Sequence, residues 1–243
     1  SSEPLQGKHL YTASFQMRNR GNGKGGGIAM LGLVADELGV SDHVLKDDYI
    51  LQIAYLDPSC KQELETAQLF PFYEVDEVQE IEAIDDHRDL DLEVRPPDVV
   101  RYFVRPKTDS VAEFAAKNEL WEFSEEELQH EFVFQRSYGI NRTYYASLGD
   151  KRAFVMSHAK NLVVFKAVGF AEQVIQYYKL SDSRAHGWIA HQRYPTKGRV
   201  WHPGGAHPFI GMHEALVHNG DFANYFGVCE YLKQNGLHPL FWK

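Results

Sequence analysis

The sequence is poor in the residues that mark several large protein classes. Only two of its 243 residues are cysteines, Cys60 and Cys229, too few for a disulfide-stapled scaffold, so we expect a reducing, cytoplasmic location. Lys and Arg number 25 against 34 Asp and Glu, a net charge of −9. Because nucleic-acid affinity rests on clustered basic residues that neutralise phosphates, we expect no nucleic-acid partner. The longest apolar run, residues 28–35, is too short to span a bilayer, so we expect no membrane partner either.

The composition otherwise fits a globular chain with a sizeable core, since 44% of the residues are hydrophobic and 24% are charged. Periodicity predicts helices at 8–20, 125–136, 171–180 and 222–236, and strands at 28–33, 47–57, 98–105, 142–148, 152–158, 161–168, 187–194 and 211–218. The closely spaced runs at 142–168 indicate a meander of antiparallel strands. Strands that cluster without strict alternation with helices favour the α+β class.

One stretch is strongly acidic. Residues 74–93 carry ten Asp and Glu against one Arg. Such a charge run is typical of a solvated surface segment or an insertion loop, which we prefer to a metal-binding segment.

Two features with possible chemistry have simpler interpretations. The run Gly21-x-Gly23-x-x-Gly26 matches the dinucleotide fingerprint in letters, but a helix precedes it and a strand follows, the reverse of the required order. We therefore expect a tight connection that needs positive φ and close backbone approach. Six histidines lie between His186 and His218, yet no metal-ligand spacing occurs among them, so the prediction is that the chain holds no metal.

A third feature combines several motifs. Residues 191–196 read HQRYPT, which would leave Arg193 and Thr196 in a loop after a strand, and an Arg there is suited to bind a carboxylate. The pair Asn219-Gly220 follows a second strand and offers a side-chain amide and an unhindered backbone N–H, the donors of an oxyanion hole. A surface Arg and an ordinary Asn-Gly turn are the alternatives for each motif alone.

Together these residues resemble the class II glutamine amidotransferases, which belong to the N-terminal-nucleophile hydrolases. The motifs are HQRYPT, AHPF and VHNGDFAN near the end of the chain, and MRNRGNGKGGGIA near its start. The resemblance implies a four-layer α/β/β/α sandwich of antiparallel sheets, formed by residues 1–243 as a single type 2 amidotransferase domain.

The spacing of the motifs narrows the resemblance. About 170 residues separate Gly21 from His191, which implies a long insert at about 58–140 and is most similar to the amidotransferase domain or subunit of glutamate synthase. The resemblance implies no cofactor in this domain. It implies a synthase subunit, or further domains of the same enzyme, that carry FMN and iron–sulfur clusters, which two isolated cysteines cannot ligate.

The resemblance also assigns roles to residues. A cysteine at the mature N-terminus attacks the glutamine amide; Asn219 and Gly220 form the oxyanion hole, and Arg20 lies near the nucleophile. Arg193 binds the glutamine α-carboxylate, Thr196 helps to hold the amino-acid end, and His207 supports the substrate pocket.

No residue of the chain fits the nucleophile. Cys60 and Cys229 lack the free α-amine that serves as base, and Ser1 lies too close to Arg20. We therefore expect a domain truncated at both ends. Two alternatives remain open: a catalytically inactive homologue that acts as a binding or regulatory subunit, and an amidotransferase that serves a different acceptor.

Overall fold

The fold is built on two antiparallel four-stranded sheets. The computed structural model describes residues 1–145, 149–194, 202–220 and 223–236. The first sheet has the strand order β1-β8-β2-β7 and the second β4-β5-β3-β6, while β9 and β10 form a separate hairpin. The strands are β1 Leu5–Gln6, β2 Gly26–Leu33, β3 Tyr49–Tyr55, β4 Tyr73–Glu80, β5 Asp98–Pro106, β6 Ala153–Ala159, β7 Leu162–Ala167, β8 Arg184–Gln192, β9 Phe209–Gly211 and β10 Glu214–Leu216. The helices are α1 Gly7–Gln16, α2 Ala35–Leu38, α3 Asp42–Asp47, α4 Lys61–Leu64, α5 Thr108–Asn118, α6 Glu125–Tyr144, α7 Ala171–Tyr177 and α8 Tyr225–Gln234.

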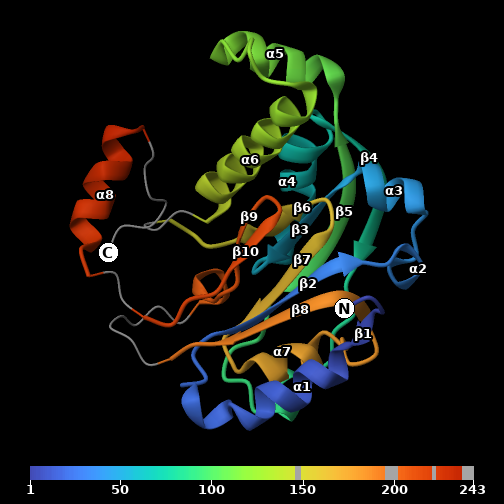
Figure 1. Cartoon of the computed structure of the whole chain (residues 1–243), viewed down its shortest axis with the longest axis vertical. Coiled ribbons are helices and arrows are strands. Elements are labelled where there is room, and N and C mark those ends of the chain that lie inside the picture. The colour runs from blue at the N-terminus through green and yellow to red at the C-terminus, as the bar shows by residue number, and fades with distance from the viewer. Residues whose placement is uncertain (146–148, 195–201, 221–222, 237–243) are drawn as a thin grey trace.

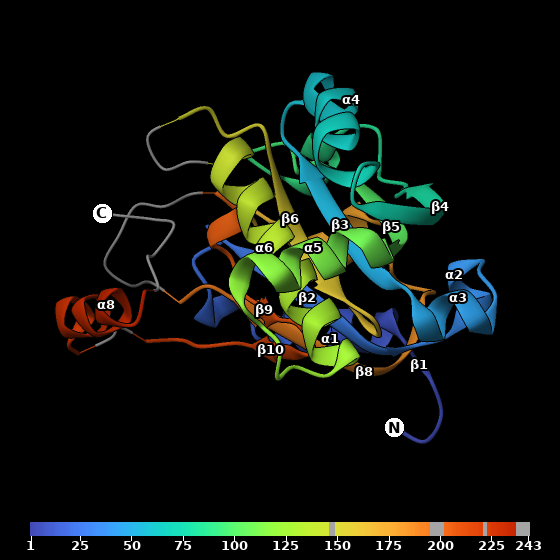
Figure 2. The ribbon, with the colours of Figure 1, turned by 90° about the horizontal axis from the view of Figure 1, so that it is seen from above.

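The helices lie outside the two sheets. Helices α1 and α7 pack on the first sheet through β8 and β2, and α6 packs on the second sheet through β6 and β5. Figures 1 and 2 show the two sheets between these helices. The predicted α+β class with antiparallel sheets is confirmed. Within the described residues, no helix is long and apolar enough to cross a membrane.

Strand β3 shows why two apolar cores form. All seven of its residues are buried, and successive side chains point to opposite faces of a strand. Ile50 and Ala54 belong to the core that includes both sheets, whereas Leu51 and Ile53 join the core beneath α6. A strand covered on both faces is therefore an almost continuous hydrophobic run.

Helix α6 is longer than the sequence pattern predicts. It begins at Ser124, whose side chain forms a capping box with Glu127, and continues to Tyr144. The predicted strand at 142–148 is therefore wrong for residues 142–144, and residues 146–148 lie outside the described part. The helix continues because Ile140 and Tyr144, four residues apart, extend its buried face.

The predicted meander is also wrong. Although β6 and β7 follow each other directly, β6 pairs with β3 in the second sheet and β7 pairs with β2 in the first. The turn between them crosses from one sheet to the other, and Asn161 fixes it by accepting hydrogen bonds from the backbone N–H groups of Gly32 and Leu33.

The predicted strand at 211–218 is instead the second half of a hairpin. Met212 has a positive φ of 53° and reverses the chain between β9 and β10. Strand Glu214–Leu216 therefore runs antiparallel to Phe209–Gly211, and residues 217–220 extend beyond the hairpin.

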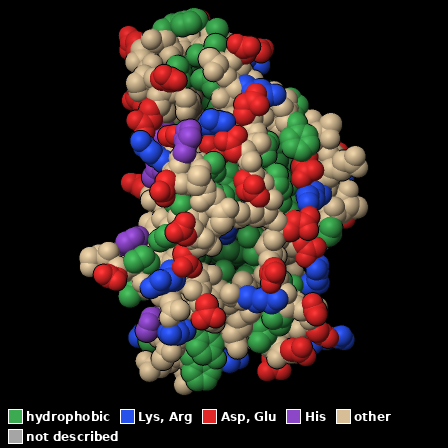
Figure 3. All heavy atoms as spheres, turned by 90° about the vertical axis from the view of Figure 1, so that its right-hand side faces the viewer, with side chains coloured by type: hydrophobic (Ala, Val, Ile, Leu, Met, Phe, Trp, Pro, Cys, Tyr) green, Lys and Arg blue, Asp and Glu red, His purple; other side chains and the backbone are tan. Residues whose placement is uncertain are grey.

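The acidic segment contains an edge strand that the sequence pattern does not predict. Strand β4 pairs with β5, and most of its residues are exposed, so the solvated surface is confirmed. Two of its carboxylates have basic partners, Asp76 with Arg105 at 2.8 Å and Glu80 with Lys61 at 2.5 Å. Figure 3 shows acidic and basic side chains interspersed on this face. Residues 58–140 include β4 and β5, two strands of the second sheet.

Candidate functional site

The predicted site residues converge where β8 ends. Strand β8 pairs with β2 up to Gln192 opposite Gly26. Past the strand, the Arg193 N–H donates to the Gly25 carbonyl at 2.8 Å, and the Arg193 carbonyl accepts from the Asn22 N–H at 2.9 Å. These two bonds fix the backbone of Arg193 against the glycine-rich loop.

The glycine run lets other segments approach this strand end. A Cβ on Gly27 would lie 2.2 Å from the carbonyl oxygen of His207, and a Cβ on Gly25 would touch Ala206 and the Arg193 side chain. Gly23 has a φ of 65°, which favours glycine. The interpretation of this run as a tight connection with close backbone approach is confirmed.

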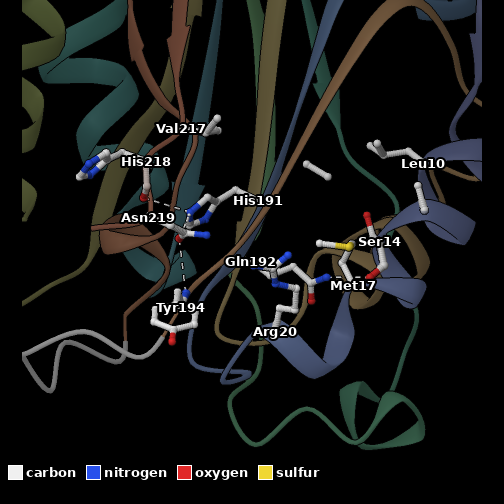
Figure 4. A pocket seen from close by; sticks show the side chains of 12 residues that line it. Leu10, Ser14, Met17, Arg20, His191, Gln192, Tyr194, Val217, His218 and Asn219 are labelled. Atoms are coloured by element: carbon white, nitrogen blue, oxygen red, sulfur yellow. Dashed lines mark hydrogen bonds between the residues drawn. The ribbon is translucent and has the colours of Figure 1, made fainter. Parts of the chain in front are cut away.

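Asn219 is held in a fixed orientation. Its Oδ1 is 2.6 Å from Nε2 of His191 and 3.4 Å from the backbone N–H of Tyr194, which donates to it. Figure 4 draws both bonds. With Oδ1 as the acceptor, His191 carries its proton on Nε2, and the Nδ2 amide of Asn219 has no partner among the described residues. The oriented amide is therefore a hydrogen-bond donor that a ligand can use.

Two pockets meet at Asn219. The larger has a volume of about 660 Å³ and lies between α1, which contributes Leu10 and Ser14, and the segment Val217–Asn219, as Figure 4 shows. The smaller, of about 120 Å³, is lined by Arg193, residues 205–207 and Gly220. Both pockets share His191, Tyr194, His218 and Asn219. The larger pocket is within the size range of small-molecule sites.

Arg20 reaches the larger pocket from the turn after α1. It ends the 3₁₀ turn Arg18–Arg20 and lines the pocket opposite Asn219. The Gln192 side chain donates to the Ser14 carbonyl at 2.7 Å, which ties β8 to α1 beneath Arg20. The structure thus brings Arg20, Arg193, His207, Asn219 and Gly220 to one strand end. Thr196 lies outside the described residues.

Burial disfavours the charged form of two histidines of the site, His191 and His207. Burial lowers the pKa of His207 to about 4, and it lowers the pKa of His191 despite the bonds to Asn219 and to the His218 carbonyl. Their rings pack 4.7 Å apart. Neutral imidazoles let Nε2 of His191 act as a donor without adding charge.

The other clustered histidines point elsewhere. His202 forms a hydrogen bond with the Tyr145 hydroxyl, and Nε2 of His213 lies 2.9 Å from Nε2 of His130 on α6. Among the described residues, no group of three His, Cys, Asp or Glu side chains is arranged to hold a metal ion.

The nucleophile candidates within the chain lie away from this site. The Ser1 amine donates to the His186 carbonyl near the start of β8, five strand residues or roughly 16 Å from His191. Cys60 is buried beside α4, where burial raises the pKa of its thiol, so it lacks thiolate character. Cys229 is buried in α8.

The sequence motifs assign His191 no role in the site. Its side chain is buried, with 7% of its surface exposed. The sequence feature that could indicate a role for His191 is its position two residues before Arg193 in HQRYPT. Alternate strand residues point to the same face, but the contact with Asn219 depends on the hairpin bringing residue 219 back, which no local pattern encodes.

No family model matches the sequence. The chain is 28% identical over 240 residues to an uncharacterized protein of Archaeoglobus fulgidus, which covers 98% of this chain and 55% of that protein. The chain therefore spans about half the length of that relative.

Two shorter similarities carry a functional name. Glutamine–fructose-6-phosphate aminotransferase (isomerizing) of Campylobacter jejuni is 29% identical over 89 residues, 36% of this chain and 15% of that protein. The enzyme of the same name from Buchnera aphidicola is 26% identical over 99 residues, 40% of this chain and 16% of that protein. The chain has distant, partial similarity to glutamine-using aminotransferases.

Proposed function

We propose that the chain is a glutamine amidotransferase domain of the N-terminal-nucleophile type, which hydrolyses glutamine to glutamate and ammonia. The observation that carries the proposal is the fixed amide of Asn219 at the junction of two pockets. The sandwich of antiparallel sheets and the partial similarity to glutamine-using enzymes support it.

The oxyanion hole is the chemical centre of this proposal. Attack on the glutamine amide carbon turns its carbonyl oxygen into an oxyanion, which Asn219 Nδ2 and the Gly220 N–H stabilise. His191 acts as a positioning residue, because its Nε2 bond holds Asn219 Oδ1 and so aims Nδ2.

Arg193 and His207 hold the substrate in the proposal. The Arg193 guanidinium pairs with the glutamine α-carboxylate, and the small pocket that it shares with His207 and Gly220 accepts the amino-acid end. Thr196 assists at the same end. The side-chain amide then reaches Asn219, and Arg20 orders the opposite wall of the larger pocket near the nucleophile.

The proposed nucleophile is a cysteine whose α-amino group is free, a role that neither Cys60 nor Cys229 can take. Its thiol adds to the amide carbon, the C–N bond breaks, and ammonia leaves with a proton delivered through the α-amine. Water then hydrolyses the thioester to glutamate and regenerates the thiol.

The ammonia is consumed at a synthase site. We propose a glutamate synthase type of reaction, with FMN and iron–sulfur clusters on the partner subunit or domains, because a long stretch separates the glycine-rich loop from HQRYPT. The similarity to glutamine–fructose-6-phosphate aminotransferases favours a second candidate, a sugar phosphate as acceptor.

The test is ammonia release from glutamine by the full-length protein, with asparagine as the control substrate. The proposal expects hydrolysis of glutamine and at least about 100-fold less of asparagine, whose shorter side chain cannot span from Arg193 to Asn219. Binding of glutamine without any ammonia release, with or without its partner, would favour the inactive, regulatory homologue. Addition of 2-oxoglutarate or fructose 6-phosphate distinguishes the acceptors.

A further inference from the structure

A second cavity lies at the edge of the two sheets, away from Asn219. It has a volume of about 240 Å³ and is closed by helix α6, strands β6 and β7, and the start of β9. We name it the Lys166 cavity. Its side chains are Phe134, Ser137, Tyr138, Asn141, Tyr145, Phe154, Val155, Met156, Ser157, His158, Lys166, Phe209 and Ile210, with Gly204.

Lys166 is a buried cation without a counter-ion in the described part of the chain. It is 4% exposed, and its Nζ lies 4.5 Å from the centre of the Phe209 ring. No hydrogen bond or ion pair to a described residue accompanies that contact. Burying an ammonium group without an anionic partner is costly, so such a group is uncommon unless a ligand uses it.

Two more polar groups of this cavity lack partners. Nδ1 of His158 and Oγ of Ser137 are buried and make no hydrogen bond within the described residues, although their side chains are 7% and 2% exposed. Buried polar groups are nearly always hydrogen-bonded. Lys166 on β7 thus shares the cavity wall with two residues, His158 on β6 and Ser137 on α6, that each carry a buried polar atom without a hydrogen bond among the described residues.

The charges around Lys166 indicate what would satisfy it. The other titratable groups of the cavity wall are His158, Tyr138 and Tyr145, and His207 lies close enough to interact with the Lys166 charge; none of these described groups is a carboxylate. Burial lowers the pKa of both His158 and His207 to about 4, so they are neutral, and burial lowers the pKa of Lys166 to about 7. An anion inside the cavity would restore the charged amine.

The side chains that line the cavity indicate which class of anion it would bind. Phe154, Met156 and Ile210 make much of the wall apolar, and Lys166 is the one Lys or Arg among the described lining residues, whereas a doubly charged phosphate favours several cationic donors. Phe134 and Phe209 are 38% and 41% exposed and lie on its solvent side. We propose that the Lys166 cavity binds a small organic monocarboxylate, with its carboxylate on Lys166 and its apolar body between these side chains.

The test is calorimetric titration of the full-length protein with benzoate, its neutral analogue benzamide, and inorganic phosphate. We expect benzoate to bind with a Kd of about 1 mM or tighter, and Lys166→Met to weaken it about 10–100-fold, the value of a charged hydrogen bond. Lys179→Met removes a lysine on the exposed surface and is the matched control. Equal affinity for benzamide, tighter binding of phosphate, or unchanged binding by Lys166→Met would overturn the proposal.

Two further readouts separate binding from folding. Without ligand, Lys166→Met should raise Tm by about 2–8 °C, because it removes an unpaired buried amine, and benzoate should then stabilise only the wild type. In the wild type, benzoate affinity should fall about tenfold per pH unit above the Lys166 pKa of about 7, since the amine loses its proton there. A flat profile between pH 6 and pH 9 would contradict a lysine–carboxylate pair.

Discussion

The two cavities differ in how their polar groups are satisfied. At the end of β8, Asn219 and Arg193 are fixed by neighbouring backbone and side-chain groups, and the site is open to solvent. In the Lys166 cavity, the buried Lys166 amine has no anionic partner in the described part of the chain, and His158 Nδ1 and Ser137 Oγ make no hydrogen bond there. The first arrangement is preorganised for a reaction. In the second, buried polar groups lack the hydrogen bonds that such groups normally make, and a bound ligand would supply them.

Replacement of Asn219 should have the largest effect and should separate the two cavities. Asn219→Ala removes one oxyanion donor, so kcat for glutamine hydrolysis should fall by roughly 10²–10³-fold, with a smaller change in KM. Steady-state ammonia release measures both constants. Benzoate affinity of the same variant should be unchanged, and an unchanged kcat would make the oxyanion assignment wrong.

Arg193→Ala should come next, with a different signature. Loss of a charge-assisted bond to the α-carboxylate should raise KM for glutamine by about 10–100-fold, with little change in kcat. Arg193→Lys should recover only part of the loss, because a lysine cannot make the paired contacts of a guanidinium. A fall in kcat at constant KM would instead connect Arg193 with the chemical step.

Gly27→Ala should have the smallest effect, on stability. The added Cβ would lie 2.2 Å from the carbonyl oxygen of His207, so the free energy of unfolding should fall by about 1–3 kcal/mol. Each kcal/mol lost should lower Tm by about 2–4 °C. Gly139→Ala is the matched control, since nothing lies within 4 Å of its Cβ and alanine favours the helix. Equal melting temperatures for the two variants would show that the glycine run tolerates bulk.

The difference between the cavities also explains what could be predicted from sequence. Arg193, Asn219 and Gly220 stand in short motifs at strand ends, so their chemistry and order are readable along the chain. Lys166 lies in an apolar strand whose sequence is typical of a buried core. The residues that line its cavity are spread along the chain between Phe134 and Ile210. No local pattern indicates that β6 and β7 enter different sheets, because both are short, almost entirely buried runs.

The other differences between the predicted and the observed elements also arise from contacts between distant parts of the chain. Helix α6 continues to Tyr144 because tertiary packing buries that side chain, although the β-rich composition of residues 142–148 favours a strand. The hairpin turn at Met212 needs a positive φ in a residue type that seldom adopts it. Its consequence, the contact of His191 with Asn219, is the part of the site that sequence reasoning missed.

The most direct test of the account is a double-mutant cycle between His191 and Asn219, measured as kcat for glutamine hydrolysis. His191→Phe alone should lower kcat about tenfold with KM kept, because the Asn219 amide loses the bond that aims it. In the Asn219→Ala background the same change should have almost no effect, since there is no amide left to position. If the two losses multiply instead, His191 does not act through Asn219, and the proposed oxyanion hole is contradicted.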